Sequence, residues 1–129
     1  MRCFDYVARD MADVDDAFAA AEDADSDGLP GTEYEGQRTE GAFYCFSPEQ
    51  IQAALGPTST ETDYAVETLG ARERPTLEAG PVLHLKPGAA VEATRLDPIL
   101  EVLRQAREKR PAPLRDDKVI AGWNGLAIR

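Results

Sequence analysis

The segment Leu96–Arg110 constrains the fold most, because it carries the clearest helical pattern in the chain. Its apolar residues recur at helical spacing and form one stripe: Leu96, Ile99, Leu100, Leu103 and Ala106. Basic residues fill the last two turns, where cations suit the helix dipole. Pro111 and Pro113 then end the helix. The sequence therefore predicts a mainly α fold whose clearest helix spans residues 96–110.

Shorter elements are predicted before this helix. Residues 47–50 (SPEQ) form a capping-box pattern that starts a helix. A second short helix is predicted over residues 61–69, which Gly70 follows. The aromatic run 41–46 (GAFYCF) and the apolar run 82–85 (VLHL) predict short strands. The expected fold class is thus mainly α with short β-hairpin elements.

The remaining segments suggest that the chain is part of something larger. Residues 13–40 are polar and rich in Asp, Gly and Glu, which predicts a long acidic loop. Residues 1–12 predict the end of a helix that lacks a cap, and residues 126–128 begin an apolar segment that the chain end interrupts. We therefore expect residues 1–129 to be an incomplete fragment. Such a fragment is expected to be marginally stable, and to aggregate, self-associate or require salt.

The charge balance limits the classes of partner. The formal net charge is −10, with 24 acidic residues against 11 Arg and only 3 Lys. This charge disfavours nucleic acids and anionic membranes as partners. No apolar run is long enough to span a membrane, and the N-terminus lacks a signal-peptide pattern, so a cytoplasmic location is expected. The acid-rich, Lys-poor composition is typical of a halophile, but GC-rich codon usage explains it equally well.

The run DADSDG invites a comparison with calcium sites. Three alternating aspartates followed by Gly28 match the first conserved positions of an EF-hand loop. The twelfth position of such a loop is a bidentate Glu, whereas Tyr34 stands there in this chain. Calcium is therefore expected to bind weakly or not at all, and no metal site is predicted.

Cysteine and histidine are too scarce for other common sites. Cys3 and Cys45 form no CxxC pair and are expected to be buried thiols. His84, the only histidine, lies between two leucines and is expected to pack rather than to bind a metal. No cofactor is predicted.

Four carboxylates lie within the six residues Glu22–Asp27. In an extended backbone Asp23, Asp25 and Asp27 point to one side, and like charges so close need solvent, a counter-charge or a cation. Glycoside chemistry uses two carboxylates roughly 5–10 Å apart, so Glu22, Asp23 and Asp25 are candidate acid/base groups. The alternative is a solvated acidic loop, which the residues alone favour.

Further candidates lie in residues 116–126 (DDKVIAGWNGL). Trp123 either stacks on a sugar ring or packs in a core. Asn124 either binds a substrate hydroxyl or caps a helix. Lys118 either neutralises the acidic loop or forms a surface pair. We expect the acidic loop and the DDK segment to lie close in space, with Lys118 approaching a carboxylate of residues 22–27 directly or through one water.

These segments, taken in order, resemble one family. The runs YVARDM, AEDADSDG, EGAFYCFSPEQIQAALG, GPVLHL and REKRPAPLRDDKVIAGWNGLAI match the middle of the YyaL-type proteins, also called spermatogenesis-associated, thioredoxin-domain-containing proteins. Family members are much longer and add a thioredoxin-like domain that this chain lacks. The match departs at residues 15–20, where a Gly-Gly-Phe-Tyr-like turn is usual, and is weak at residues 70–80.

The resemblance implies a partial (α/α) toroid similar to the six-hairpin glycosidase and N-acylglucosamine 2-epimerase folds. It implies catalytic carboxylates at Glu22, Asp23 and Asp25, and substrate-binding positions at Asp117, Lys118, Trp123 and Asn124. The implied partner is a sugar-like or polyol small molecule, as in carbohydrate metabolism. The isolated chain is expected to be inactive without the rest of the parent protein. The alternative is a non-catalytic scaffold, or a segment of a thiol quality-control protein.

Overall fold

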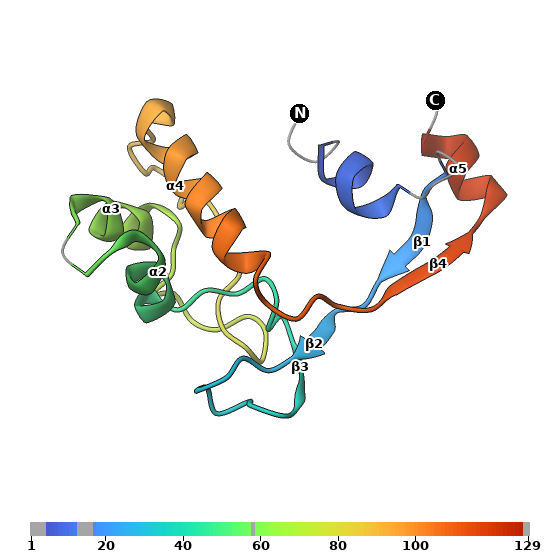
Figure 1. Cartoon of the computed structure of the whole chain (residues 1–129). Helices are drawn as coiled ribbons and strands as arrows, with labels where there is room; N and C mark the ends of the chain where they lie inside the picture. Colours follow the sequence, from blue (N-terminus) through green and yellow to red (C-terminus); the bar gives the residue numbers. More distant parts are fainter. Residues whose placement is uncertain (1–4, 13–16, 58, 128–129) are drawn as a thin grey trace. The chain divides into compact units, whose positions relative to one another are not determined.

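The computed structural model describes residues 5–12, 17–57 and 59–127. It combines helices with two small antiparallel sheets (Figure 1). The chain divides into two compact units, the first formed by residues 1–24 with 113–129 and the second by residues 25–112. Each unit is described by itself. In the described part of the chain, no helix is long and apolar enough to cross a membrane.

The first unit contains a two-stranded ribbon. Strand β1 (Ala19–Glu22) pairs antiparallel with β4 (Arg115–Val119) (Figure 1). Before the ribbon lies the short π-helix η1 (Val7–Met11), which agrees with the helix predicted for residues 1–12, and after it lies helix α5 (Ala121–Ala127). Among the described residues of this unit, Ala19 is the only buried hydrophobic one. This unit therefore has almost no core of its own.

The second unit begins with a hairpin. Strand β2 (Asp25–Asp27) pairs antiparallel with β3 (Arg38–Glu40). Alternation along the strands turns Ser26 and Thr39 inward, where each is 2% exposed. Together with β1, this hairpin corrects the prediction of one long loop over residues 13–40. Within residues 17–40, the stretches outside β1, β2 and β3 have no regular secondary structure of more than a turn or an isolated bridge.

The predicted strand over residues 41–46 is wrong. The chain turns there instead, because the amides of Tyr44 and Cys45 both donate to the carbonyl oxygen of Gly41, at 2.9 and 2.8 Å. Gly41 has φ +81°, and an added Cβ would lie 2.7 Å from Leu77 Cδ1. A side chain at this position would therefore be strained by the backbone conformation and would also displace the end of the Leu77 side chain.

Helix α2 (Pro48–Leu55) begins where the capping box predicts. The Ser47 hydroxyl accepts from the Gln50 amide at 3.2 Å, and the Gln50 side chain accepts from the Ser47 amide at 2.9 Å. Gly56 ends the helix. Helix α3 (Thr60–Thr68) agrees with the second predicted helix within one residue at each end, and the Ser59 hydroxyl caps it.

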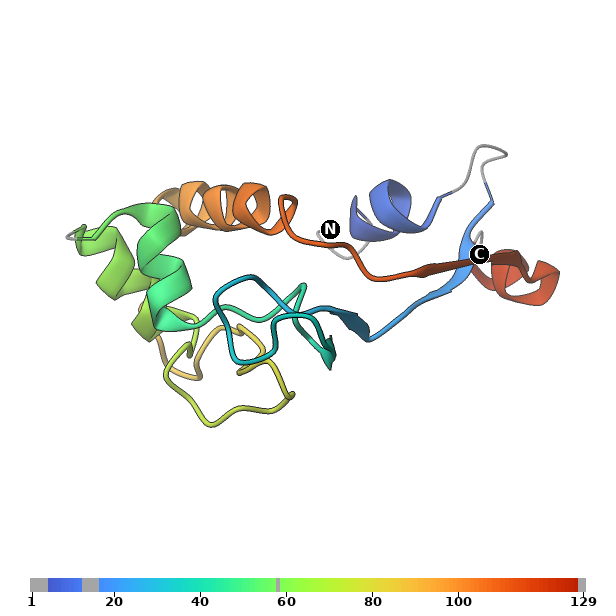
Figure 2. The ribbon, with the colours of Figure 1, turned by 60° about the horizontal axis from the view of Figure 1, so that its bottom comes forward.

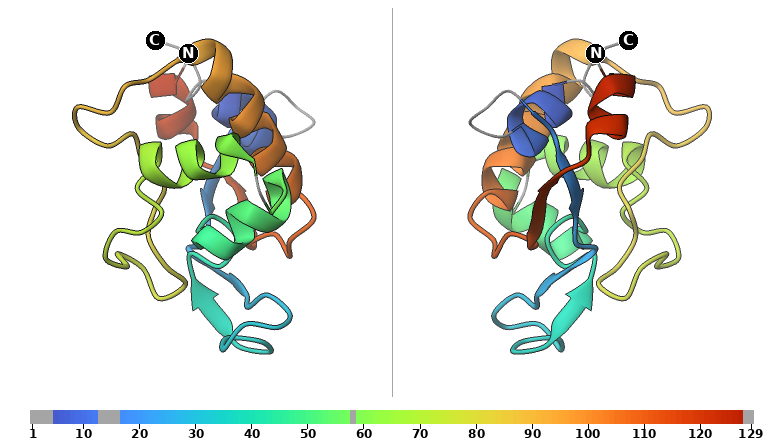
Figure 3. Two further views of the ribbon diagram at one scale, coloured as in Figure 1. Left: turned by 90° about the vertical axis from the view of Figure 1, so that its left-hand side faces the viewer. Right: turned by 90° about the vertical axis from the view of Figure 1, so that its right-hand side faces the viewer.

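Helix α4 (Ala93–Arg107) is the clearest helix of the structure, as predicted, but it starts and ends three residues earlier. Pro98 therefore lies inside the helix and leaves one backbone hydrogen bond unmade. The predicted stripe faces the core. Figure 3 shows α4 grouped with α2 and α3, and the buried side chains between them include Phe46, Ile51, Val66, Leu69, Leu96, Ile99 and Leu103.

The segment between α3 and α4 is a long loop (Figure 2). The strand predicted for residues 82–85 is not formed. This stretch is extended, but its hydrogen bonds go to the end of α3: the His84 amide donates to the Leu69 carbonyl oxygen at 3.2 Å, and the Lys86 amide to that of Thr68 at 3.0 Å. Without a neighbouring strand, no ladder can form.

Candidate functional site

The β1–β4 ribbon brings several of the predicted site residues together. Ala21 lies opposite Asp116 and Glu22 lies opposite Arg115. The Asp23 amide continues the pairing by donating to the Leu114 carbonyl oxygen at 2.8 Å. The acidic segment and the DDK segment are thus neighbours through residues 21–23, as the sequence predicts.

One face of the ribbon carries a polar cluster, which we name the Glu22 cluster: Tyr6, Glu22, Arg115 and Asp117. The Tyr6 hydroxyl donates to Glu22 Oε2 at 2.5 Å, and Arg115 Nε donates to Asp117 Oδ1 at 2.6 Å. Glu22 lies directly opposite Arg115 in the ladder, so the side chains of these two residues and of Asp117 share a face.

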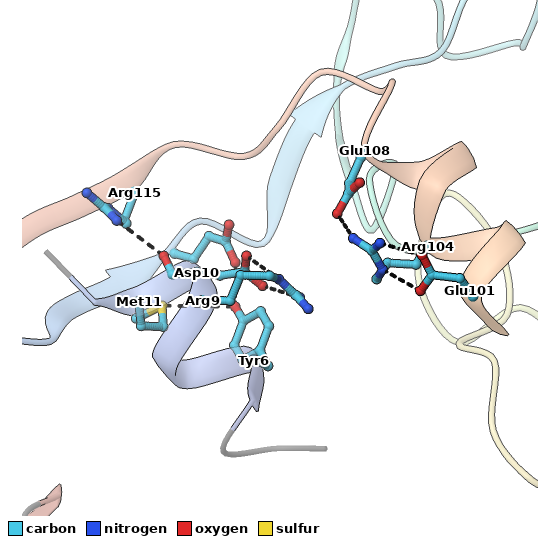
Figure 4. A network of polar contacts seen from close by, with 9 residues as sticks. Tyr6, Arg9, Asp10, Met11, Glu101, Arg104, Glu108 and Arg115 are labelled. Carbon is cyan, nitrogen blue, oxygen red and sulfur yellow. Dashed lines mark hydrogen bonds and ion pairs between the residues drawn. The ribbon is translucent and has the colours of Figure 1, made fainter. Parts of the chain in front are cut away.

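Arg115 also connects this cluster to the end of η1 and to the residue that follows it. Its Nη1 donates to the Asp10 carbonyl oxygen at 3.2 Å and to that of Ala12 at 3.4 Å. Figure 4 shows Arg115 reaching Asp10, and Tyr6 on the same helix. Sequence reasoning missed both Tyr6 and Arg115. Alternation within the extended run RDDK would have predicted the Arg115–Asp117 pair, but no local signal indicates Tyr6.

Lys118 pairs with Asp116 and, within the described structure, makes no direct contact with the carboxylates of residues 22–27, the direct form of the predicted approach. Its ammonium nitrogen lies 3.0 Å from Asp116 Oδ2, and its described contacts include no carboxylate of residues 22–27. Asp116 and Lys118 are two residues apart on one strand, so they share the face opposite Asp117. The hydrogen bond from Lys118 lowers the pKa of Asp116. Asp117 and Lys118, predicted to act together, therefore point to opposite faces of β4.

Helix α5 carries the last two predicted residues. Trp123 is 56% exposed, so it is not a core residue of the described structure. Asn124 has a structural contact: its Oδ1 accepts from the Phe18 amide at 2.7 Å, and its Nδ2 donates to the Phe18 carbonyl oxygen at 3.0 Å. This pair of bonds fixes α5 to the residue before β1.

Asp25 and Asp27 belong to the second unit, in β2. The predicted carboxylate group is therefore divided between the units after Ala24. In the described part of the chain, no group of three or more His, Cys, Asp or Glu side chains is placed to hold a metal ion.

In the second unit, the side chain of Arg110 binds a backbone turn, a contact that the sequence did not predict. Arg110 lies beyond the end of α4, and its Nη1 donates to three backbone carbonyl oxygens, at 3.1 Å to Ala42, 3.1 Å to Phe43 and 2.6 Å to Cys45. Its guanidinium lies 3.8 Å from the centroid of the Phe46 ring. Arg110 therefore stabilises the turn over residues 41–46, and it lies beyond the last turn of α4, in which the sequence had placed it to interact with the helix dipole.

Cys45 is buried in this turn, as predicted for a thiol without a redox partner, and is 3% exposed. Cys3 lies outside the described residues. Burial raises the pKa of the Cys45 thiol, and the nearby Arg110 opposes the shift only in part.

We therefore expect Cys45 to react slowly with thiol reagents. In a Cys3→Ser variant at pH 8, the native chain should react at least about tenfold more slowly than the chain in urea, because the raised pKa and burial both reduce accessible thiolate. The measurement is the rate of modification by a chromogenic disulfide reagent. Equal rates in buffer and in urea would contradict the burial of Cys45.

The chain is similar in sequence to known proteins of one kind. No protein-family model matches the chain. The chain is 33% identical to spermatogenesis-associated protein 20 of Homo sapiens over 152 residues, and 30% identical to that of Rattus norvegicus over 151 residues; both matches cover 95% of the chain. The chain spans only 19% of the length of these relatives. The similarity supports the family that the sequence motifs resemble.

Proposed function

We propose that this chain is a segment of a larger protein related to spermatogenesis-associated protein 20, and that its first unit presents a surface for a sugar-like or polyol ligand. In the larger protein, its helices would belong to an (α/α) toroid similar to the six-hairpin glycosidase and epimerase folds. The Glu22 cluster is the observation that supports this proposal most, because it concentrates carboxylates and hydrogen-bond donors on one face of a ribbon.

The chemistry of this face suits a polyhydroxylated ligand. Carboxylates accept hydrogen bonds from hydroxyl groups, and a guanidinium and a phenol donate to them. Trp123 supplies an exposed flat ring of the kind on which sugars stack. In this proposal, Glu22 and Asp23 act as acid/base carboxylates in the larger protein, and Asp117 and Trp123 contact the ligand. Asp25 belongs to the second unit, Lys118 lies on the other face of β4 and Asn124 is bonded to Phe18, so the proposed surface does not include them.

A non-catalytic scaffold is the second candidate, and one observation favours it. Several predicted site residues already have internal partners: Glu22 accepts from Tyr6, Lys118 pairs with Asp116, and Asn124 holds Phe18. Polar groups that stabilise the fold in this way need no ligand. A scaffold role explains these contacts without invoking catalysis.

Titration of the full chain with glucose, N-acetylglucosamine and sorbitol at millimolar concentrations tests the binding proposal. We expect amide and Trp123 indole shifts in NMR spectra that concentrate in the first unit, with no glycoside turnover. Asp117→Asn should weaken binding about tenfold, because a hydrogen bond to a charged group contributes roughly 1.5–3 kcal/mol.

Glu101→Gln provides a control with the same loss of charge. Glu101 lies on α4 and pairs with Arg104, together with Glu108 (Figure 4). This variant should bind the sugars as the unchanged chain does. Absence of shifts with every ligand would reject the binding proposal and leave the scaffold, and equal losses in both variants would reject a role for the Glu22 cluster.

A further inference from the structure

A hollow lies between α2 and α4 in the second unit. Its volume is about 490 Å³, within the range of small-molecule sites. Apolar side chains of Phe46, Ala54, Val102 and Ala106 line it, and the basic residues Lys109 and Arg110 line it as well. The hollow thus combines an apolar wall with positive charge, in a chain whose net charge is −10.

Among the described residues, Arg110 has no anionic partner. Its hydrogen-bond acceptors in the described structure are the three carbonyl oxygens of the 41–46 turn and, at 3.4 Å, the side-chain oxygen of Gln50. All of these acceptors are neutral. Burial lowers the pKa of Arg110 to about 10, but the group stays charged at neutral pH. Charged groups that are withdrawn from water are normally paired with an opposite charge.

The charged residues next to Arg110 do not neutralise its positive charge, because they are cations themselves. Arg107 lies over the rings of Phe43 and Tyr44, at 5.5 and 5.4 Å, and its buried Nε has no hydrogen-bond partner within the described residues. Its charge also lowers the pKa of Arg110. Lys109 forms no ion pair in the part of the chain that the structure describes. Within the described ranges, these three neighbouring cations therefore have no carboxylate partner.

We propose that this hollow binds a small organic carboxylate. The apolar part of the ligand lies against Phe46 and the apolar wall of α2 and α4. Its carboxylate is bound by Lys109 and by Nη2 of Arg110, the nitrogen that does not bond the carbonyl oxygens of the turn. A ligand with a single negative charge is sufficient, because backbone carbonyl oxygens already accept the hydrogen bonds of Arg110 Nη1. This inference is independent of the ligand proposed for the first unit.

Titration of the full chain with hexanoate tests the proposal, with 1-hexanol and acetate as controls. We expect hexanoate to shift the amide resonances of α2 and of the end of α4, with an affinity that falls as salt is added. Hexanol lacks the charge and acetate lacks the apolar body, so each should bind at least about fivefold more weakly. Equal binding of hexanoate and hexanol would overturn the charge recognition.

Lys109→Gln and Lys86→Gln form a matched pair, because both remove one lysine charge from the second unit, and Lys86 lies outside the hollow and pairs with Glu67. Lys109→Gln should weaken hexanoate binding about fivefold, and Lys86→Gln should leave it unchanged. Ala53→Glu, at an exposed residue of the hollow, should abolish binding by adding a like charge. Equal losses in the two lysine variants, unchanged binding in Ala53→Glu, or no shifts with hexanoate would overturn the proposal.

Discussion

Replacing Arg110 by alanine should lower the free energy of unfolding by about 2–4 kcal/mol. The substitution removes three hydrogen bonds to backbone carbonyl oxygens and a cation–π contact with Phe46. Hydrogen bonds to charged groups contribute roughly 1.5–3 kcal/mol, and buried acceptors left without a donor cost more. Urea denaturation followed by circular dichroism measures the difference.

Arg104→Ala is the matched control, because it removes the same side chain from the same end of α4. Arg104 pairs with Glu101 and Glu108 on the helix surface, and exposed pairs contribute roughly 0–1 kcal/mol. Its loss should therefore be much the smaller of the two. If both variants lost equal stability, Arg110 would contribute no more than a surface pair, and the turn over residues 41–46 would be held by its glycine and by packing.

The contact of Arg110 joins two segments that lie far apart in the sequence. The run EGAFYCF forms the turn, and the run REKRP supplies the arginine that binds its carbonyl oxygens. Sequence reasoning assigned the aromatic run to a strand and the arginine to a helix end. Neither interpretation could include a contact between a side chain and backbone atoms about 65 residues away.

The predictions that succeeded depend on neighbouring residues. Ser47 and Gln50, which lie within one helical turn of each other, determine where α2 starts. The apolar stripe of α4 determines which face of that helix is buried. Strand predictions failed because a strand needs a partner that may lie anywhere in the sequence. β1 pairs with β4, which follows it by more than 90 residues, whereas residues 82–85 have no partner strand among the described residues.

In the candidate site, too, the sequence predicted some features and missed those that depend on distant strand pairing. The sequence predicted that the acidic and DDK segments would be close, and residues 21–23 are indeed paired with or bonded to residues 114–116. It did not predict which side chains share a face. That depends on the register of the ribbon, which includes an irregularity between Ala19 and Ala21. Because of this register, Asp117 lies with Glu22, and Lys118 lies on the other face.

Replacing Ile51 by alanine should destabilise the chain by about 3–4 kcal/mol, the largest effect that we expect from a single side chain. Ile51 is fully buried, and it packs in the core formed by the helices of the second unit. Truncating a buried isoleucine to alanine removes apolar burial and leaves a cavity, and such changes cost roughly 2–5 kcal/mol. The measurement is again the free energy of unfolding in urea.

Leu126→Ala provides the contrast, because it removes a side chain of similar size from the first unit. Leu126 is 70% exposed, so its loss should change the unfolding free energy by less than about 0.5 kcal/mol. The expected difference follows from the distribution of buried apolar residues, nearly all of which belong to the second unit in the described structure. A large loss from Leu126→Ala would show that α5 packs against an apolar surface in solution, as self-association would produce, and would contradict its exposure.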